Sequence, residues 1–221
     1  TWWGRHHAQC CTPLRGTVRS DHGSQHGSLG FLTEVTVENL FPSLDRIFAG
    51  EYVLDERVML RGRIDRHGEH VAQGTVLNDI VVSKGNLARM IELEIKIDGQ
   101  FVTNLRGDGL IVSTPTGSTA YSLSAGGPII EPSVEALILT PISPHTLSHR
   151  PLVISSTVEL EVTLTSHDEG AMTTFDGQVG IAVGHGDTLL VKASEYKSQL
   201  VRFPEKSYYE VLRKKLRWGN A

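Results

Sequence analysis

Short runs of alternating apolar and polar residues are the feature that most constrains how this chain of 221 residues can fold. The run Ile91–Ile97 alternates strictly, and Asp98-Gly99 then leads into a second run, Phe101–Thr103. A period of two places alternate side chains on one face of a strand, and Asp-Gly is a common sequence of tight hairpin turns. The pattern therefore predicts a β-hairpin with one buried face.

Several other segments repeat this arrangement of apolar runs and turn sequences. The runs lie at residues 53–64, 76–82, 110–113, 158–164 and 189–191, and the turns at Asp108-Gly109, Asp176-Gly177 and Gly186-Asp187. Many short strands separated by turns are typical of a β-sandwich or a similar layered β domain.

Three segments favour helices instead. Residues 35–48 carry a helical apolar stripe, but Pro42 near the middle predicts a split into two short pieces. A second helix is expected from Ser118. The third is Tyr208–Arg217, which has Ser207 as its cap and basic residues toward its end.

The composition excludes several classes of protein. Apolar residues make up 39% and charged residues 21% of the chain, as in ordinary globular proteins. A net charge of −4 gives no support to nucleic-acid binding. No apolar run reaches the roughly 18 residues that a membrane span needs. The two cysteines, Cys10 and Cys11, are adjacent and cannot form a disulfide framework, so we expect a cytoplasmic location.

Polar residues interrupt an apolar run at Leu77-Asn78-Asp79-Ile80. One interpretation is a turn or a sheet edge. The other is a carboxylate and an amide held at the end of a rigid strand beside a cleft. Such a pair can bind two sugar hydroxyls, because a carboxylate accepts two O–H donors and an amide both donates and accepts.

A long stretch of small and hydroxyl-bearing residues covers 107–128. It predicts a strand, a Thr/Ser/Gly loop and then a helix, a junction that exposes N–H groups and hydroxyls to an anion. No Lys follows the glycine, so it is not a Walker loop, and the dinucleotide glycine pattern is also absent. A flexible polar loop is the alternative. The segment Phe175–Gln178, taken alone, indicates a hairpin turn.

Five segments together carry a resemblance to a known family. They are Gly27–Glu34, Leu77–Asp79, Gly107–Pro128, Pro144–Val153 and Asp176–Gln178. In this order they closely resemble the bacterial NAD kinases, which use ATP or polyphosphate to phosphorylate NAD. The resemblance covers nearly everything from Gly27 onward.

The resemblance implies a mixed α+β fold, with a partial N-terminal α/β domain followed by a β-rich, sandwich-like C-terminal domain. Residues 27–50 would belong to the N-terminal domain and 51–200 to the NAD-binding domain. Residues 201–221 would form a helical segment that returns to the N-terminal domain.

The resemblance also assigns the residues of an NAD site. Asn78 and Asp79 would contact ribose, and Arg89, Arg106 and Asp108 would lie around the same site. A wall around the two ends of NAD would consist of Thr119, Ala120, Tyr121, Ser122, Leu123 and Ser124, with Gln178 closing it. His145 and His149 are interpreted as structural or interface residues. No catalytic residue and no metal ligand is assigned.

The activity implied is the transfer of phosphate from ATP to the adenosine-ribose 2′-hydroxyl of NAD, which gives NADP. A divalent cation, Mg²⁺ or Mn²⁺, would offset the charge of the phosphates. The resemblance further implies a homo-oligomer, a dimer or a tetramer, with no nucleic-acid or membrane partner.

One part of the family pattern is missing. A Gly-Gly-Asp-Gly-Thr signature, whose Asp is expected to act as the base, should precede Gly30 and is not found. Residues 1–26 instead hold both cysteines and four histidines, without apolar periodicity. We expect NAD binding at best and little or no kinase turnover from this chain. A metal site at His6, His7, Cys10 and Cys11 is disfavoured, because the spacing is not a closed zinc pattern.

The genetic code suggests a hypothesis for residues 1–26. Trp2-Trp3 must be encoded TGG TGG, and a shift of one base gives Gly-Gly. The codons of Gly4–Ala8 then allow Asp-Gly-Thr, and the shifted frame joins the family pattern again at Gly27. The hypothesis is an out-of-frame signature segment, which the nucleotide sequence tests.

Three alternatives stay open. The chain could be a non-catalytic dinucleotide-binding or oligomer-forming module. It could act on lipids, because diacylglycerol and sphingosine kinases share the Gly-Gly-Asp-Gly signature. It could also be a purely structural β-sandwich, which no nucleotide would bind.

Overall fold

The computed structural model describes residues 35, 37–85, 89–146, 148–167, 170–205 and 207–218. Residues 1–26, with the expected out-of-frame segment, and Gly27–Glu34 lie outside this described part. The described chain divides into two compact units. The larger is Val53–Arg202, and the smaller combines the residues before and after it. Within the described part no helix is long and apolar enough to cross a membrane.

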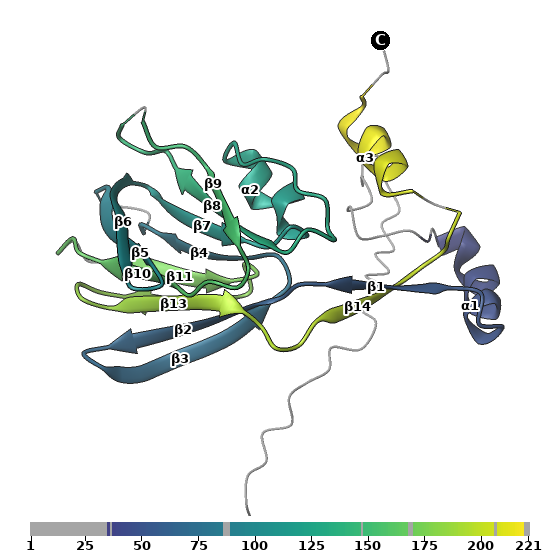
Figure 1. Ribbon diagram of the computed structural model, residues 1–221, viewed down its shortest axis with the longest axis horizontal. Coiled ribbons are helices and arrows are strands. Elements are labelled where there is room, and N and C mark those ends of the chain that lie inside the picture. The colour runs from purple at the N-terminus through teal and green to yellow at the C-terminus, as the bar shows by residue number, and fades with distance from the viewer. Residues whose placement is uncertain are drawn as a thin grey trace, which may run out of the picture. The chain divides into compact units, whose positions relative to one another are not determined.

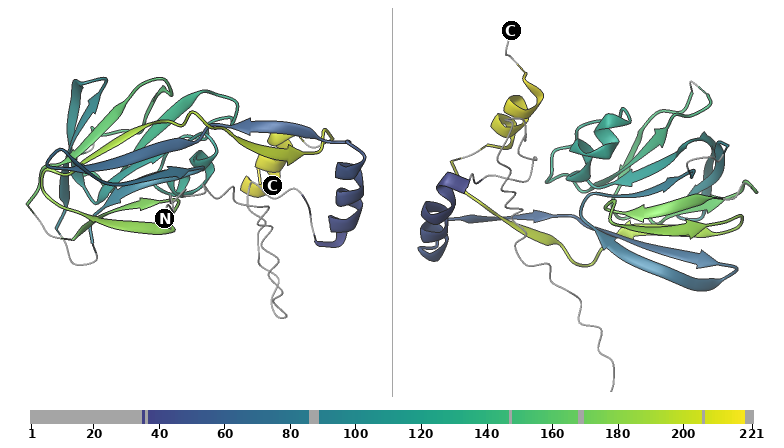
Figure 2. Two further views of the ribbon diagram at one scale, coloured as in Figure 1. Left: turned by 90° about the horizontal axis from the view of Figure 1, so that it is seen from below. Right: turned by 180° about the vertical axis from the view of Figure 1, so that it is seen from behind.

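Two six-stranded antiparallel sheets make up most of the larger unit (Figures 1 and 2). The first sheet has the order β3-β2-β13-β10-β5-β6, and the second the order β12-β11-β4-β7-β8-β9. The strands of the first are β2 (Leu60–Arg66), β3 (Glu69–Val76), β5 (Ile91–Ile97), β6 (Gln100–Gly107), β10 (Leu160–Leu164) and β13 (Thr188–Ala193). Those of the second are β4 (Asp79–Ser83), β7 (Gly109–Ser113), β8 (Ala136–Ile142), β9 (Leu152–Ser155), β11 (Ala171–Phe175) and β12 (Val179–Val183). The mixed fold with a β-sandwich, predicted from the sequence, is confirmed.

A separate two-stranded ribbon pairs β1 (Val53–Arg57) with β14 (Ser198–Arg202). The Asp55 carboxylate joins its strands, because it accepts hydrogen bonds from Arg57 at 2.6 Å and Arg202 at 3.2 Å. Burial by itself would raise the pKa of Asp55, but the two guanidinium groups together outweigh it and lower the pKa.

The predicted hairpins are present. Between β5 and β6, Asp98 and Gly99 both have positive φ, at 48° and 74°. Asp176 and Gly177 repeat this between β11 and β12, at 49° and 63°. Asp and Gly tolerate this left-handed backbone, and two such residues in a row form the turn that matches the twist of the strands.

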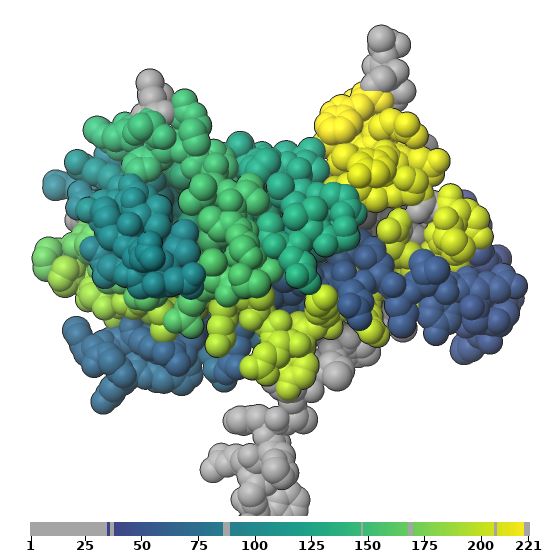
Figure 3. Space-filling model, viewed as in Figure 1, coloured from purple at the N-terminus to yellow at the C-terminus, as the bar shows by residue number. Residues whose placement is uncertain are grey.

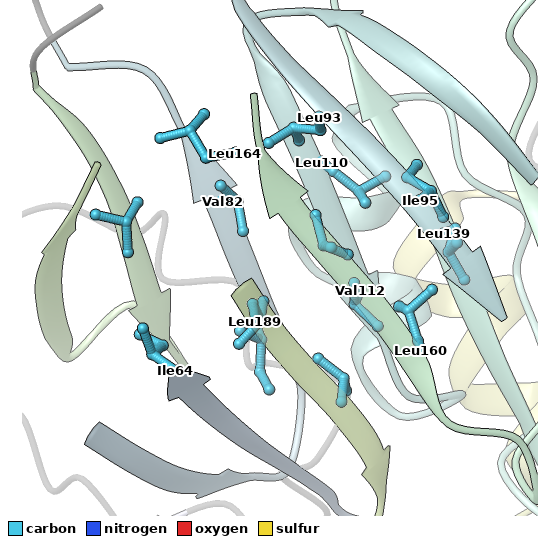
Figure 4. Close-up of a cluster of buried hydrophobic side chains, with 14 of the residues drawn as sticks. Ile64, Val82, Leu93, Ile95, Leu110, Val112, Leu139, Leu160, Leu164 and Leu189 are labelled. Atoms are coloured by element: carbon cyan, nitrogen blue, oxygen red, sulfur yellow. The ribbon is translucent and has the colours of Figure 1, made fainter. Parts of the chain in front are cut away.

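The core lies between the two sheets. Leu60, Ile64, Leu93, Leu160 and Val191 of the first sheet face Ile80, Val82, Leu110, Val112 and Leu137 of the second, and ten side chains of this cluster are labelled in Figure 4. This face is continuous because each strand directs every second side chain inward. The sandwich is therefore a direct result of the alternating pattern of the sequence.

One aromatic side chain of the second sheet fits into a gap in the first. Gly62 of β2 and Gly74 of β3 are direct partners in the sheet. The Phe175 ring occupies the space above them, so a Cβ at either position would lie 2.8–2.9 Å from a ring carbon. Two glycines thus create the hole that one phenylalanine fills.

The other face of the second sheet is covered by the Thr/Ser/Gly segment. Val81, Ile111 and Ile138 are buried there, outside the core between the sheets. The covering elements are the 3₁₀ turn η2 (Gly117–Thr119) and the short helix α2 (Tyr121–Ser124), which adjoins the green surface of β8 and β9 in Figure 3. The helix expected from Ser118 is thus interrupted at Ala120, whose φ and ψ of −99° and −126° are not helical.

The smaller unit contains η1 (Val37–Asn39), α1 (Leu40–Phe48) and α3 (Tyr208–Leu216). The expected split at Pro42 is wrong, since α1 continues through it. Pro42 lies in the first turn, where an N–H has no partner within the helix, so its ring costs little. The α3 prediction is confirmed, with Ser207 and Glu210 forming a reciprocal capping box.

We predict that Phe175→Ala lowers the free energy of unfolding of the larger unit by about 3–5 kcal/mol, because it leaves a cavity over the two glycines. Chemical denaturation monitored by circular dichroism measures the change. Phe101→Ala is the matched control, since that ring is 58% exposed. An equal loss in both variants would contradict the role of Phe175 in the core.

Candidate functional site

A pocket of about 360 Å³ opens on the covered face of the second sheet. Asp79, Val81 and Ser83 project from β4 and Thr174 from β11, and they share one face because these strands are paired. The full lining consists of Asn78, Asp79, Val81, Ser83, Ala120, Tyr121, Thr174, Asp176 and Gly177. All nine belong to the larger unit.

The Asp176 carboxylate holds one end of the pocket together. Its oxygens accept hydrogen bonds from the backbone N–H groups of Leu77 at 2.9 Å, Asn78 at 2.8 Å and Asp79 at 3.1 Å. In return, the Asp176 N–H donates to the Asp79 carbonyl at 3.0 Å. The turn between β3 and β4 is thereby fixed to a hairpin about a hundred residues later in the chain.

The hydroxyl-rich loop braces the same turn from the other side. Thr114 donates its hydroxyl to the Leu77 carbonyl at 2.6 Å, and its N–H donates to the Asn78 carbonyl at 2.9 Å. Gly117 lies so close to Asn78 that any Cβ at position 117 would collide with the Asn78 backbone. A glycine is therefore required for this contact, and Asn78 is held between the loop and Asp176.

The same hydrogen bonds change the interpretation of the loop as an anion site. The N–H groups of Thr114, Gly117, Ser118 and Ala120 all donate to acceptors within the protein. A phosphate needs free N–H donors or cations. The loop thus acts mainly as a support for the pocket, and these four amides are not a phosphate cradle.

Asp79 is the most perturbed group of the site. It is 6% exposed, and no described residue donates a hydrogen bond to its carboxyl oxygens. Burial, and next the negative charge of Asp176, raise its pKa from 3.8 to about 6. The Asp79 carboxyl is thus an acceptor at the pocket that receives no hydrogen bond from the described residues.

Four of the residues predicted for the site line this pocket: Asn78, Asp79, Ala120 and Tyr121. Others of the predicted wall do not. Ser122 is fully buried, and its hydroxyl pairs with that of Thr140 at 2.8 Å. Thr119 donates its hydroxyl to the Thr116 carbonyl at 3.3 Å. Leu123 and Ser124 belong to α2 but not to the lining, and the exposed Gln178 only continues the β11–β12 turn.

The three charged residues expected around the site are not among the residues that line this pocket. Asp108 pairs with Lys84 at 2.9 Å, beyond the end of β4 opposite to Asp79. Arg106 of β6 lies 3.6 Å from Glu92, and Arg89 is exposed just before β5. None of the three lines the pocket, nor does His145 or His149. The described lining therefore contains two carboxylates and no cation.

Asp176 is the residue whose structural role in the pocket the local sequence pattern does not reveal. The pattern indicates only a hairpin turn there, because the three donors of Asp176 lie far away in the chain. Val81, Ser83 and Thr174 are also absent from the predicted site, although the alternation of β4 places its residues 79, 81 and 83 on one face. That signal could have identified two of the three.

A metal ion has no obvious place among the described residues. They contain no group of three His, Cys, Asp or Glu side chains that could hold one. Both oxygens of Asp176 are already engaged by N–H groups. The expected divalent cation therefore does not fit this pocket as a resident ion.

Asp176→Ala tests the brace at the end of the pocket. We expect a loss of about 3 kcal/mol in the free energy of unfolding, because three N–H groups lose a charged acceptor. Thermal and chemical denaturation provide the measurement. Asp176→Asn keeps the left-handed turn and one acceptor oxygen, so it should lose less; an Asp176→Asn variant as stable as the unmodified chain would assign the effect of Asp176→Ala to the backbone turn instead of the carboxylate.

Asp79 and Asp187 form a matched pair of buried carboxylates, 6% and 3% exposed, with opposite pKa shifts. Hydrogen bonds from Arg66 lower the pKa of Asp187, whereas burial raises that of Asp79. Because the pKa of Asp79 is raised to about 6 in the folded protein, the free energy of unfolding falls as the pH rises from about 4 through about 6. The fall is about 3 kcal/mol.

We predict that Asp79→Asn stabilises the protein at pH 8 and that the gain fades toward pH 4. Asp187→Asn should destabilise it at pH 8, because Asp187 contributes stability above its unfolded pKa that is lost as the pH falls through its lowered folded pKa. Denaturation of both variants across this pH range measures the two slopes. Destabilisation by Asp79→Asn at pH 8 would contradict the assignment of a buried, unpaired charge.

Comparisons with known proteins identify the family. Residues 77–203 match the model of the ATP-NAD kinase C-terminal domain. An NAD kinase of Geotalea daltonii is 49% identical over 197 residues, which are 89% of this chain and 69% of that protein. An NAD kinase of Geobacter sulfurreducens is 47% identical over the same shares of both chains.

Solved structures agree with these relatives. Yeast NADH kinase complexed with NADH superimposes with a TM-score of 0.82 at 29% identity, over 89% of this chain and 58% of that one. An NAD kinase from Archaeoglobus fulgidus in complex with ATP gives a TM-score of 0.67 at 31% identity, over 85% and 70%. This chain thus spans somewhat more than half of the yeast protein and about two thirds of the others. By sequence and by structure, it belongs to the NAD kinase family.

Proposed function

We propose that the pocket at Asp79 and Asp176 binds a ribose and its base from NAD, as part of the phosphorylation of NAD to NADP with ATP. The observation that carries this proposal is the recessed carboxyl of Asp79 in a pocket that Asn78 also lines. Vicinal ribose hydroxyls supply two O–H donors to a carboxylate, and an amide beside it can both donate and accept.

The rest of the lining suits a nucleoside. Tyr121 is 47% exposed at the rim, where its ring can cover one face of a flat base. Val81 supplies an apolar floor, and Ser83 and Thr174 supply hydroxyls. With two carboxylates and no cation among the described lining residues, the pocket suits the uncharged parts of NAD, and its phosphates would lie outside.

This arrangement supports binding more directly than turnover. Phosphoryl transfer depends on positioning, on a base and on groups that offset the phosphate charge. The pocket supplies positioning, but the expected base belongs to the missing signature. We therefore propose that this chain binds NAD with little or no kinase activity. Mg²⁺ or Mn²⁺ would accompany ATP through its phosphates rather than occupy the pocket.

The assembly and the location are part of the proposal. The family resemblance implies a dimer or a tetramer in the cytoplasm. Exposed apolar residues on the edge strands, Leu152 and Val153 in β9 and Val179 in β12, support self-association.

Calorimetry with NAD, together with a coupled assay for NADP formation, tests the function. We expect binding at pH 8 and turnover far below that of an intact NAD kinase. Tyr121→Ala should weaken binding about tenfold, since a stacked ring contributes on the order of 1 kcal/mol. Tyr196→Phe, at an exposed position outside the pocket, is the control.

The possible outcomes separate the alternatives. Binding without turnover supports a dinucleotide-binding module, and turnover at an ordinary rate would refute the proposed impairment. Failure to bind NAD would leave the structural sandwich as the better description.

A further inference from the structure

The surroundings of the Asp79 carboxyl disfavour its ionised form. Its carboxyl is buried next to Asp176, yet no described residue supplies it with a hydrogen-bond donor. A buried carboxylate without donors or a cation is costly, and the usual response is to keep a proton. The effect of these surroundings on ligand binding is inferred for NAD, and it rests on the proposed function of the pocket as an NAD site.

The groups around Asp79 leave it no internal counter-ion. From the end of β11 it meets Asp176, and from the η2–α2 side the uncharged Ala120 and Tyr121. Across the sheet in β7 its partner is Ser113, whose buried hydroxyl makes no hydrogen bond with the described residues. Asp176 and Tyr121 are thus the only other titratable groups of the described lining.

Two cations on neighbouring segments are already paired. Lys84, beyond the far end of β4, pairs with Asp108 at 2.9 Å. Arg57, beneath the hydroxyl-rich loop, donates to Asp55 at 2.6 Å and to the Thr116 hydroxyl at 3.3 Å. Neither residue lines the pocket, so the described structure offers Asp79 only repulsion from Asp176.

We propose that NAD binding expels a proton from Asp79, so that occupancy of this pocket is linked to pH. Below about pH 6 the free protein holds Asp79 as the neutral acid beside Asp176. In the complex two ribose hydroxyls donate to it, and the ionised form accepts both, which the acid cannot do equally well. The O–H bond of the acid breaks, its electron pair stays on the carboxylate, and water or buffer takes the proton.

The pH range is set by the burial of Asp79. Its pKa of about 6 in the free protein means that little proton remains to be released above pH 7. At pH 6 about half a proton leaves for each NAD bound, and at pH 5 about nine tenths of one. The dissociation constant should therefore rise roughly tenfold from pH 7 to pH 5, as a single linked proton requires.

Calorimetry in two buffers of different ionisation enthalpy measures the released proton directly. NAD is the suitable probe, because its pyrophosphate has no monoester group that titrates in this range, unlike NADP. At pH 5.5 we expect release of roughly three quarters of a proton per NAD, and at pH 8 essentially none. Release that is absent at both pH values, with normal binding, would overturn the inference and leave the proposed function intact.

Two variants identify the source of the proton. Asp79→Asn should bind NAD with the same affinity at pH 5.5 and 8 and release no proton. Glu69→Gln, the same change at an exposed position of β3, should keep the linkage of the unmodified chain. If Asp79→Asn still releases a proton, another group is responsible and the inference is wrong. If the unmodified chain binds no NAD even at pH 8, the proposed function fails and this inference with it.

A measurement without ligand shows whether the Asp79→Asn variant is folded. Carboxyl carbon NMR of the free protein should show one resonance that titrates near pH 6 and is lost in Asp79→Asn while the remaining spectrum is preserved. On adding NAD at pH 6, that resonance should move to the position of the ionised form. Movement to the position of the acid would overturn the inference.

Discussion

Three backbone N–H groups that donate to the Asp176 carboxylate are the interaction on which the site depends. They join the turn before β4 to the hairpin after β11, and neither segment would hold Asn78 and Asp79 in place alone. The preceding residue, Phe175, is fixed in the core by the gap above Gly62 and Gly74. Packing between the sheets therefore determines where the pocket carboxylates lie.

The position of Asp79 shows how binding and stability oppose each other in this fold. Asp187, which is even less exposed, has Arg66 as a bidentate partner and accepts a hydrogen bond from the Gly184 N–H. Asp79 has no such partners within the described residues, and a carboxylate beside it instead. A carboxyl that has no hydrogen-bond donor in the fold can accept hydrogen bonds from a ligand. The free energy that its burial costs is offset by the packing of the surrounding sandwich.

The sequence was most informative where the signal was local, although the local expectation of a split at Pro42 was wrong. Strict alternation predicted the β5–β6 hairpin, Asp-Gly pairs predicted its turn and that of β11–β12, and Ser207 predicted the cap of α3. It was uninformative where contacts join distant segments. Nothing near Asp176 in the chain indicates its donors, and nothing near Ser122 indicates that Thr140 binds it. The positions of Arg106 and Asp108 depend on sheet order, which a one-dimensional pattern does not contain.

The gap over Gly62 and Gly74 must match the Phe175 ring that fills it, although the three residues are distant in the sequence. Gly62 is also close to Ile80, which directly follows Asp79, so the contact touches the strand that carries the pocket carboxyl. A methyl group added to either glycine could be tolerated only together with a smaller ring or a shifted strand. Substitutions in the first sheet could thereby alter ligand preference from behind the pocket, without contacting the ligand.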